Sequence, residues 1–298
     1  MLLPPLYKFL DPEGVKLTIG NGTFKHAKPS DFNDLEDLTV SSIFPGSLEN
    51  AVREIQENFV DIVLENLDVA PTCSSPAREK LLLIQEVFRR SPEASRLLRK
   101  ELAESYESLY DLDRLANVSL EFLKDFNDFM QWNRVLCVTT ELTSDKMWAE
   151  YAGNFSGAAI RIQPNVQKDS KFQLFRPVTY REERPSLYET PSKFIRQSLF
   201  GNRDLGAKMA IEKVIYSKTL NWQHEHEYRL VVPVARDEAP WNTLSYHAEE
   251  IIELYLGARM TGQDRHTMTR LAKLRNPEIA IYQQVVGGVG ALRFERIL

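Results

Sequence analysis

The chain has few residues that could cross-link it. Only two cysteines, Cys73 and Cys137, occur among 298 residues, and their spacing is not that of a metal site. Such usage argues against a disulfide-built fold and predicts reduced thiols and a cytoplasmic location. Of the five histidines, His224 and His226 would share a strand face, but no third ligand stands at a motif spacing. We therefore predict no metal.

Long apolar runs and concentrated positive charge are also lacking. No stretch approaches the roughly 18 to 20 apolar residues of a membrane span, and the first residues, MLLPPLYKFLDPEG, do not have the apolar core of a signal peptide. The net charge is -5, and the densest basic segment, 270–275, is typical of a solvated helix face. We expect no membrane association and no strong nucleic-acid footprint.

The order of periodic segments predicts the fold class. Segments 6–10 and 23–27 are β-prone, with Gly20-Asn21-Gly22 as a turn that feeds the second. Apolar residues then recur every three or four positions from Ser47 to Met130, which predicts about four helices. A continuous β-prone run at 135–140 predicts a buried strand.

The second half of the chain alternates between the two kinds of element. Helices are expected near 146–151, 207–218 and 263–274, and strands at 157–162, 228–234, 251–256, 279–286 and 291–297. The whole predicts an α+β fold with a mixed sheet. We expect a single domain over residues 1–298, with an all-helical insertion at about 46–132.

Three clusters of polar and aromatic residues carry a family resemblance. They lie at 6–9 with 29–37, at 147–152 with Asn154 and Gly157, and at 216–218 with 222–230, and 251–257 accompanies them. In order and spacing they resemble the signature blocks of the bacterial family known as domain of unknown function 2971. Two positions depart from that pattern, because Glu150 stands where the family usually has histidine and Leu35 where it has proline.

A more distant resemblance concerns the strand ends. The middle strand ends in Thr139-Thr140, and Glu225-His226-Glu227 opens a late strand. This arrangement is similar to ADP-ribosyltransferases of the DNA-modifying toxin type. The resemblance implies a split mixed sheet, NAD as co-substrate, Glu227 as catalytic carboxylate, Glu225 as its acceptor-side partner and Thr140 as its orienting hydroxyl. A carboxylate suits this chemistry because breaking the nicotinamide–ribose bond develops oxocarbenium charge.

The same resemblance implies residues that hold NAD. Tyr7 and Lys8 would meet the adenosine ribose or the phosphates, while Trp148 and Tyr151 would line a nicotinamide pocket. The residues alone leave other interpretations open. A core anchor is the default interpretation of Trp148 and Tyr151. The default for Glu225, Glu227 and Arg229 is a solvated ladder of alternating charge along one strand face.

The resulting functional hypothesis is an NAD-dependent ADP-ribosyltransferase-like enzyme, or an NAD glycohydrolase, acting in bacterial conflict or phage defence. Whether the acceptor is a protein or a nucleic acid stays open. The alternative is a non-catalytic sensor or binding module that uses the same cleft for a ligand or a partner protein. A nuclease ranks last, because the sequence offers no clustered carboxylate–metal motif and no basic groove.

Overall fold

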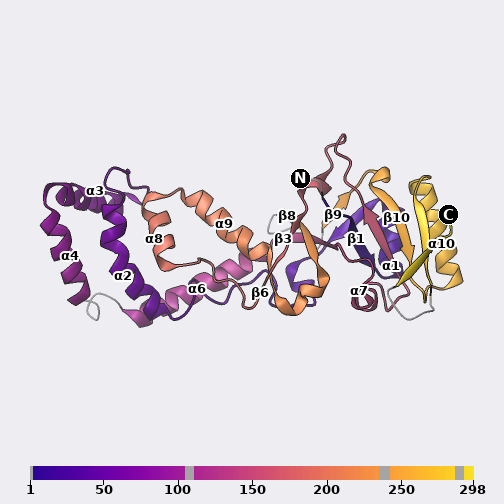
Figure 1. Ribbon diagram of the computed structural model, residues 1–298, viewed down its shortest axis with the longest axis horizontal. Coiled ribbons are helices and arrows are strands. Elements are labelled where there is room, and N and C mark those ends of the chain that lie inside the picture. Colours follow the sequence, from indigo (N-terminus) through magenta and orange to yellow (C-terminus); the bar gives the residue numbers. More distant parts are fainter. Residues whose placement is uncertain (1–2, 105–110, 235–241, 286–291) are drawn as a thin grey trace. The chain divides into compact units, whose positions relative to one another are not determined.

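The computed structural model describes residues 3–104, 111–234, 242–285 and 292–298 (Figure 1). The chain divides into two compact units. The first, called the sheet unit here, comprises residues 1–37, 131–182 and 218–298. The second, the helical unit, comprises residues 38–130 and 183–217. The helical unit thus takes in a second chain segment that the expected insertion at about 46–132 did not include.

An eight-stranded mixed sheet forms the centre of the sheet unit, in the order β12-β11-β10-β4-β1-β3-β8-β5. Only β10 and β11 run parallel among these pairs, and the helix α10 connects them. Two further pairs, β2 with β9 and β6 with β7, lie beside it. The strands are β1 Leu6–Leu10, β2 Thr23–His26, β3 Asn133–Thr139, β4 Ala158–Ile162, β5 Arg176–Pro177, β6 Thr179–Arg181, β7 Ser217–Thr219, β8 Glu227–Pro233, β9 Asn242–Ser245, β10 Ile251–Leu256, β11 Ala280–Val285 and β12 Arg293–Arg296.

Helices cover both faces of this sheet. On one face α1 and α10 bury Ile19 and Met268 against strand residues such as Leu6 and Ile160. On the other face α7 buries Trp148 against alternate residues of the same strands. The helices of this unit are α1 Pro12–Asn21, α7 Asp145–Tyr151 and α10 Gly262–Arg275, with short 3-10 helices η1 Pro29–Asp31, η2 Lys171–Leu174, η3 Leu220–Glu225 and η4 Ala248–Glu250.

The connection between the first two strands corrects the sequence analysis, which expected a brief turn there. Instead α1 fills it. Asp11 caps this helix by accepting a hydrogen bond from the Gly14 N–H, and Pro12 follows at the first helical position. Gly22 ends it in the left-handed conformation, at φ 68°. These capping signals were present in the sequence and outweigh the turn propensity of Gly20-Asn21.

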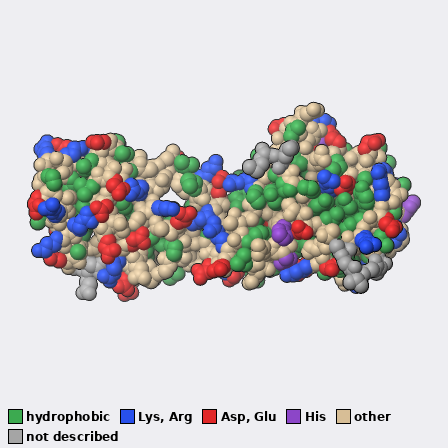
Figure 2. Space-filling model, viewed as in Figure 1, with side chains coloured by type: hydrophobic (Ala, Val, Ile, Leu, Met, Phe, Trp, Pro, Cys, Tyr) green, Lys and Arg blue, Asp and Glu red, His purple; other side chains and the backbone are tan. Residues whose placement is uncertain are grey.

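The helical unit confirms the predicted helices between Ser47 and Met130, apart from positions 105–110, which lie outside the described residues. Val60, Leu81 and Phe88 belong to its core. Figure 2 shows Lys and Arg side chains interspersed with Asp and Glu side chains over α2, α3 and α4. The helices of this unit are α2 Leu48–Leu64, α3 Ser75–Arg90, α4 Pro92–Glu104, α6 Leu112–Met130, α8 Pro191–Phe200 and α9 Arg203–Ile215.

The central sheet parts between β1 and β3. These strands share one register pair, Tyr7 with Thr139, whereas β3 and β8 stay paired over the full length of β3. Further along β3 the neighbour is no longer β1, because Ala27 after β2 bridges to Val135. An opening therefore forms at the middle of the sheet. In the described part of the chain no helix is long and apolar enough to cross a membrane.

Candidate functional site

A cavity of about 550 Å³ lies where the sheet parts. Its size is within the range of small-molecule sites. The lining comes mainly from β1, β2, β3, α7, the segment around η1, β7, the end of η3 and the start of β8, all within the sheet unit. The polar lining residues are Tyr7, Lys8, Asp11, Lys25, Asp31, Asn33, Asp34, Cys137, Thr139, Glu150, Tyr151, Lys218, Glu225 and Glu227.

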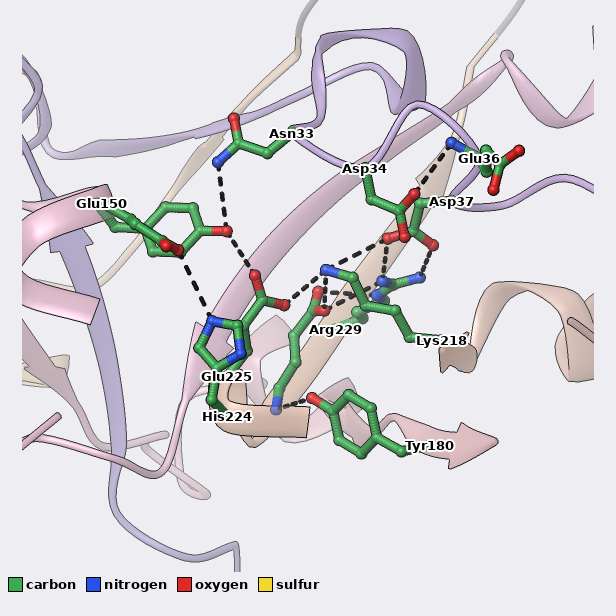
Figure 3. A network of polar contacts seen from close by, with 12 residues as sticks. Asn33, Asp34, Glu36, Asp37, Glu150, Tyr180, Lys218, His224, Glu225 and Arg229 are labelled. Atoms are coloured by element: carbon green, nitrogen blue, oxygen red, sulfur yellow. Dashed lines mark hydrogen bonds and ion pairs between the residues drawn. The ribbon is translucent and has the colours of Figure 1, made fainter. Parts of the chain in front are cut away.

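A buried ion-pair network stands behind this cavity, centred on Arg229 (Figure 3). The Arg229 side chain has no exposed surface. Its Nη1 and Nη2 donate to the two carboxylate oxygens of Asp37 at 2.9 and 2.5 Å. Its Nε and Nη2 donate to Glu227 at 2.8 and 3.1 Å. One guanidinium thus grips two carboxylates in paired geometry, which is the strongest form of this interaction.

Lys218 joins this network to Glu225. Its Nζ lies 2.6 Å from Glu225 Oε2 and 3.3 Å from Glu227 Oε2, and 4.6 Å above the Trp222 ring. The other oxygen of Glu225 accepts from the Tyr151 hydroxyl at 2.5 Å. The Tyr151 hydroxyl in turn accepts a hydrogen bond from Asn33 Nδ2 at 3.4 Å, and Figure 3 shows the chain of contacts between Asn33 and Glu225. Glu225 and Glu227 both line the cavity, and Glu225 is the one that accepts a hydrogen bond from the lining residue Tyr151.

Burial and pairing shift the two glutamates in opposite directions. For Glu225, burial and the neighbouring Glu227 carboxylate raise the pKa above its ordinary value. For Glu227, burial acts in the same sense, but Arg229 and Lys218 outweigh it and lower the pKa. Burial also raises the pKa of the Tyr151 hydroxyl, and the Glu225 carboxylate adds to that shift. Glu225 and Tyr151 therefore keep their protons to higher pH than is usual for these groups, whereas Glu227 loses its proton at lower pH.

The network carries an excess of negative charge. It sets the carboxylates of Asp37, Glu225 and Glu227 against the two cations Lys218 and Arg229. Arg229 pairs with both Asp37 and Glu227, whereas Glu225 pairs with Lys218 at 2.6 Å, so three carboxylates share two cations beside the cavity. A site of this kind favours a cation or a cationic transition state.

The local backbone explains how Glu225 and Glu227 both reach Lys218. Glu225 ends η3, and His226 turns the chain in the left-handed conformation at φ 42°. Glu227 then begins β8, its N–H donating to the Tyr180 hydroxyl at 2.8 Å. The interpretation of a solvated charge ladder is wrong. Glu225 precedes the strand, and Glu225, Glu227 and Arg229 are 5%, 4% and 0% exposed.

Of the other predicted site residues, three line the cavity and two do not. Tyr7, Lys8 and Tyr151 line the cavity. Thr140 is not among the lining residues. It follows the end of β3, and its N–H donates to the carbonyl of His226. Thr139 lines the cavity in its place and faces Glu227 in the strand register.

Trp148 belongs to the core and does not line the cavity, which corrects its expected role as a nicotinamide platform. The ring has no exposed surface. It packs edge-on against Phe9 and parallel to Phe155, and its Nε1 donates to the Leu142 carbonyl at 2.8 Å. Tyr151, three positions later, packs against the same hydrophobic cluster, but it lines the cavity and its hydroxyl reaches Glu225.

The same sequence cluster contains a second structural residue. Gly157 opens β4 so close to β1 that a Cβ atom there would lie 2.0 Å from the Leu10 carbonyl oxygen. Asn154 adopts a left-handed φ of 53° just before it. In this cluster, packing and turn geometry therefore account for Trp148, Asn154 and Gly157.

Sequence reasoning missed Asp37 and Cys137. Asp37 stands 192 positions before Arg229, and nothing local to it indicates an ion pair. Cys137 alternates with Thr139 along β3 and lines the cavity. Burial and the Glu227 carboxylate raise the pKa of its thiol. The described residues contain no group of three or more His, Cys, Asp or Glu side chains able to hold a metal ion.

Comparison with known proteins identifies one family. Residues 147–230 match the family described as protein of unknown function (DUF2971). The match confirms the predicted resemblance for the second and third clusters, while the first cluster lies outside it. No curated protein matches the chain. No solved structure matches it either, so the similarity to ADP-ribosyltransferases stays a prediction.

Proposed function

We propose that the sheet unit binds the nicotinamide–ribose part of NAD in this cavity and breaks the bond between them. The observation that carries the proposal is the buried network beside the cavity, in which three carboxylates share two cations and Glu225 bonds to the lining residue Tyr151. As the C1′–N bond breaks, its electron pair leaves with nicotinamide, and positive charge develops on the ribose. A fixed carboxylate beside that ribose lowers the barrier, because its charge is already oriented and little water screens it.

Within this proposal Glu225 takes the role that the resemblance to ADP-ribosyltransferases implied for Glu227. Glu227 is clamped by Arg229, which has no exposed surface. Glu225 instead bonds to Tyr151, a lining residue in contact with the exposed Asn33. A ribose hydroxyl can replace the Tyr151 hydroxyl as donor to Glu225. Glu227 then serves to hold Lys218 and Arg229, and thereby positions Glu225.

The test is release of nicotinamide from NAD by the unmodified protein and by Glu225→Gln. Loss of one electrostatic stabiliser predicts a fall of about 10²- to 10³-fold. Glu253→Gln is the matched control. Glu253 also bonds a tyrosine hydroxyl and a cation, Tyr255 at 2.6 Å and Arg161 at 2.9 Å, but is not among the lining residues. Equal release by Glu225→Gln and the unmodified protein would refute the assignment.

A non-catalytic sensor is the second candidate. The observation in its favour is that both oxygens of Glu225 already have protein donors, so a ligand must compete with Tyr151. A sensor would bind NAD or ADP-ribose and gain thermal stability by mass action. No nicotinamide would be released. A rise in melting temperature without turnover therefore selects the sensor. The setting in conflict or phage defence stays a prediction.

A further inference from the structure

A second chain of polar contacts borders the cavity, separate from the Arg229 network. It joins Lys146 and Glu150 of α7 to His224 of η3. Lys146 Nζ lies 3.3 Å from His224 Nδ1, and His224 Nε2 lies 3.7 Å from Glu150 Oε2. Figure 3 shows His224 facing Glu150 across this gap. The Trp222 ring lies roughly parallel to the imidazole, with 6.2 Å between centroids.

The contact between Lys146 and His224 indicates which nitrogen of the imidazole ring accepts a hydrogen bond. A lysine ammonium group only donates, so Nδ1 of His224 must accept from Lys146. In the neutral ring the proton then resides on Nε2, the nitrogen that faces Glu150. Nε2 is buried and has no hydrogen-bond partner within 3.5 Å in the described part of the chain, and the Glu150 carboxylate lies 3.7 Å from it. His224 therefore turns its Nε2 edge toward the Glu150 carboxylate.

Glu150 differs from the two glutamates of the network in its access to solvent. It lines the cavity, and its side chain is 35% exposed, against 6% for Glu225 and 4% for Glu227. Lys146 also lies 3.9 Å from its other oxygen. Glu150 is thus a carboxylate that an incoming molecule can reach.

We propose that Glu150 is the general base that activates the nucleophile which attacks the ribose. This inference rests on the proposed function. Water, or an acceptor hydroxyl, enters beside Glu150. Its oxygen bonds to C1′ as the C1′–N bond breaks, the electron pair leaves with nicotinamide, and the proton passes to the Glu150 carboxylate and then to solvent. Glu225 stabilises charge, and Glu150 removes the proton.

The division of labour follows from the charges around each carboxylate. Glu225 faces Lys218, Glu227 and Tyr151, and its oxygens are occupied. Glu150 faces Lys146 and His224 on the protein side, and shares the cavity lining with Asp31, Asp34 and Lys218. Positioned bases of this kind contribute about 10²- to 10⁴-fold.

The experiment compares nicotinamide release by the unmodified protein, Glu150→Ala, Glu225→Ala and Glu249→Ala, with and without sodium azide. Glu249→Ala is the matched surface control, since its 43% exposed side chain pairs with Lys168 and is not among the lining residues. Glu150→Ala should lose about 10²-fold or more in kcat with little change in KM. Azide is an anion that needs no deprotonation, so it should restore much of this rate and yield an azido sugar.

The outcomes separate the two proposals. Azide should not rescue Glu225→Ala, because it cannot replace a stabilising charge there. If Glu150→Ala keeps the full rate, or is slow and azide leaves it slow, Glu150 is not the base, although the proposed function stands. If the unmodified protein releases no nicotinamide, both proposals fall. His224→Gln tests the positioning role and should lower kcat less than Glu150→Ala, with its rate also raised by azide.

Discussion

Arg229 in the sheet unit and Arg90 in the helical unit each pair with carboxylates, yet their surroundings are opposite. The Arg229 side chain is fully buried. The Arg90 side chain is 78% exposed and meets Glu86 one helical turn earlier. Exposed pairs contribute about 0 to 1 kcal/mol, whereas buried charges must first lose their hydration.

The difference shows where charge is retained for a reason other than solubility. In the helical unit, charged residues occupy the solvated faces of helices that bury an apolar core. In the sheet unit, five charged groups are held out of water beside a cavity. Perturbed ionisable groups of this kind cluster at functional sites. The comparison therefore favours the sheet unit as the location of the proposed function.

The largest expected effect is that of Arg229→Met. The substitution leaves Asp37 and Glu227 buried without their main cation, so we expect a loss of about 3 to 5 kcal/mol in the free energy of unfolding. Urea unfolding measures it. A triple variant with Asp37→Leu and Glu227→Leu added should recover most of the loss, since no unpaired charge remains. A loss as small as that of Arg90→Met would contradict the buried network.

Trp148→Ala should rank next. The fully buried ring leaves a cavity between Phe9 and Phe155, and such truncations reduce stability by about 3 to 5 kcal/mol. Leu83→Ala in the helical unit is the comparison, because Leu83 is 66% exposed and should change stability by no more than about 0.5 kcal/mol. Urea or thermal unfolding measures both losses. If Trp148→Ala lost no more stability than Leu83→Ala, Trp148 would not be a core residue, and its expected role in the cavity lining would stand.

Much of the fold could be predicted from the sequence, and the buried network could not. Apolar spacing gave the helices of the 47–130 segment, because each of them has one face turned to a core. The same reasoning failed for Glu225, Glu227 and Arg229. Alternating charge is compatible with a solvated strand face. The contact that indicates a buried ion pair is the one between Arg229 and Asp37, and these residues lie 192 positions apart.

The signature clusters gave the location of the site better than its roles. They contain Tyr151, Lys218, Glu225 and Glu227, which meet at the cavity. They also contain Trp148 and Gly157, which serve packing. A sequence shows that residues recur together, but burial and contact decide whether a residue serves chemistry or structure.

Stability against pH should separate Glu227 from Glu225. The pKa of Glu227 is lowered in the folded state, so its stabilising contribution is complete above its ordinary value of 4.5 and is lost as pH falls below it. The pKa of Glu225 is raised, so the folded state binds its proton more tightly, and stability declines as pH rises above 4.5.

The measurement is the free energy of unfolding of the unmodified protein, Glu227→Gln and Glu225→Gln between pH 3 and pH 7. As pH rises from 3 to about 4.5, the unmodified protein should gain stability relative to Glu227→Gln. As pH rises beyond that, it should lose stability relative to Glu225→Gln. Slopes of the same sign for both variants would show that the two carboxylates do not differ as the contacts require.

The smallest expected effect is that of breaking the exposed ion pair between Arg90 and Glu86. Arg90→Gln removes one ion pair with Glu86 at the end of α3, where a cation also favours the helix dipole. We expect a loss of about 0.5 kcal/mol at low salt. At 1 M salt the Debye length is about 3 Å, so most of this loss should vanish.

The loss caused by Arg229→Met should persist at 1 M salt, because ions do not reach a side chain without exposed surface. Urea unfolding of both variants at low and high salt measures the contrast, with the unmodified protein at each salt concentration as reference. If salt reduced both losses equally, the Arg229 network would be accessible to solvent, and its excess charge could not act on a substrate as proposed.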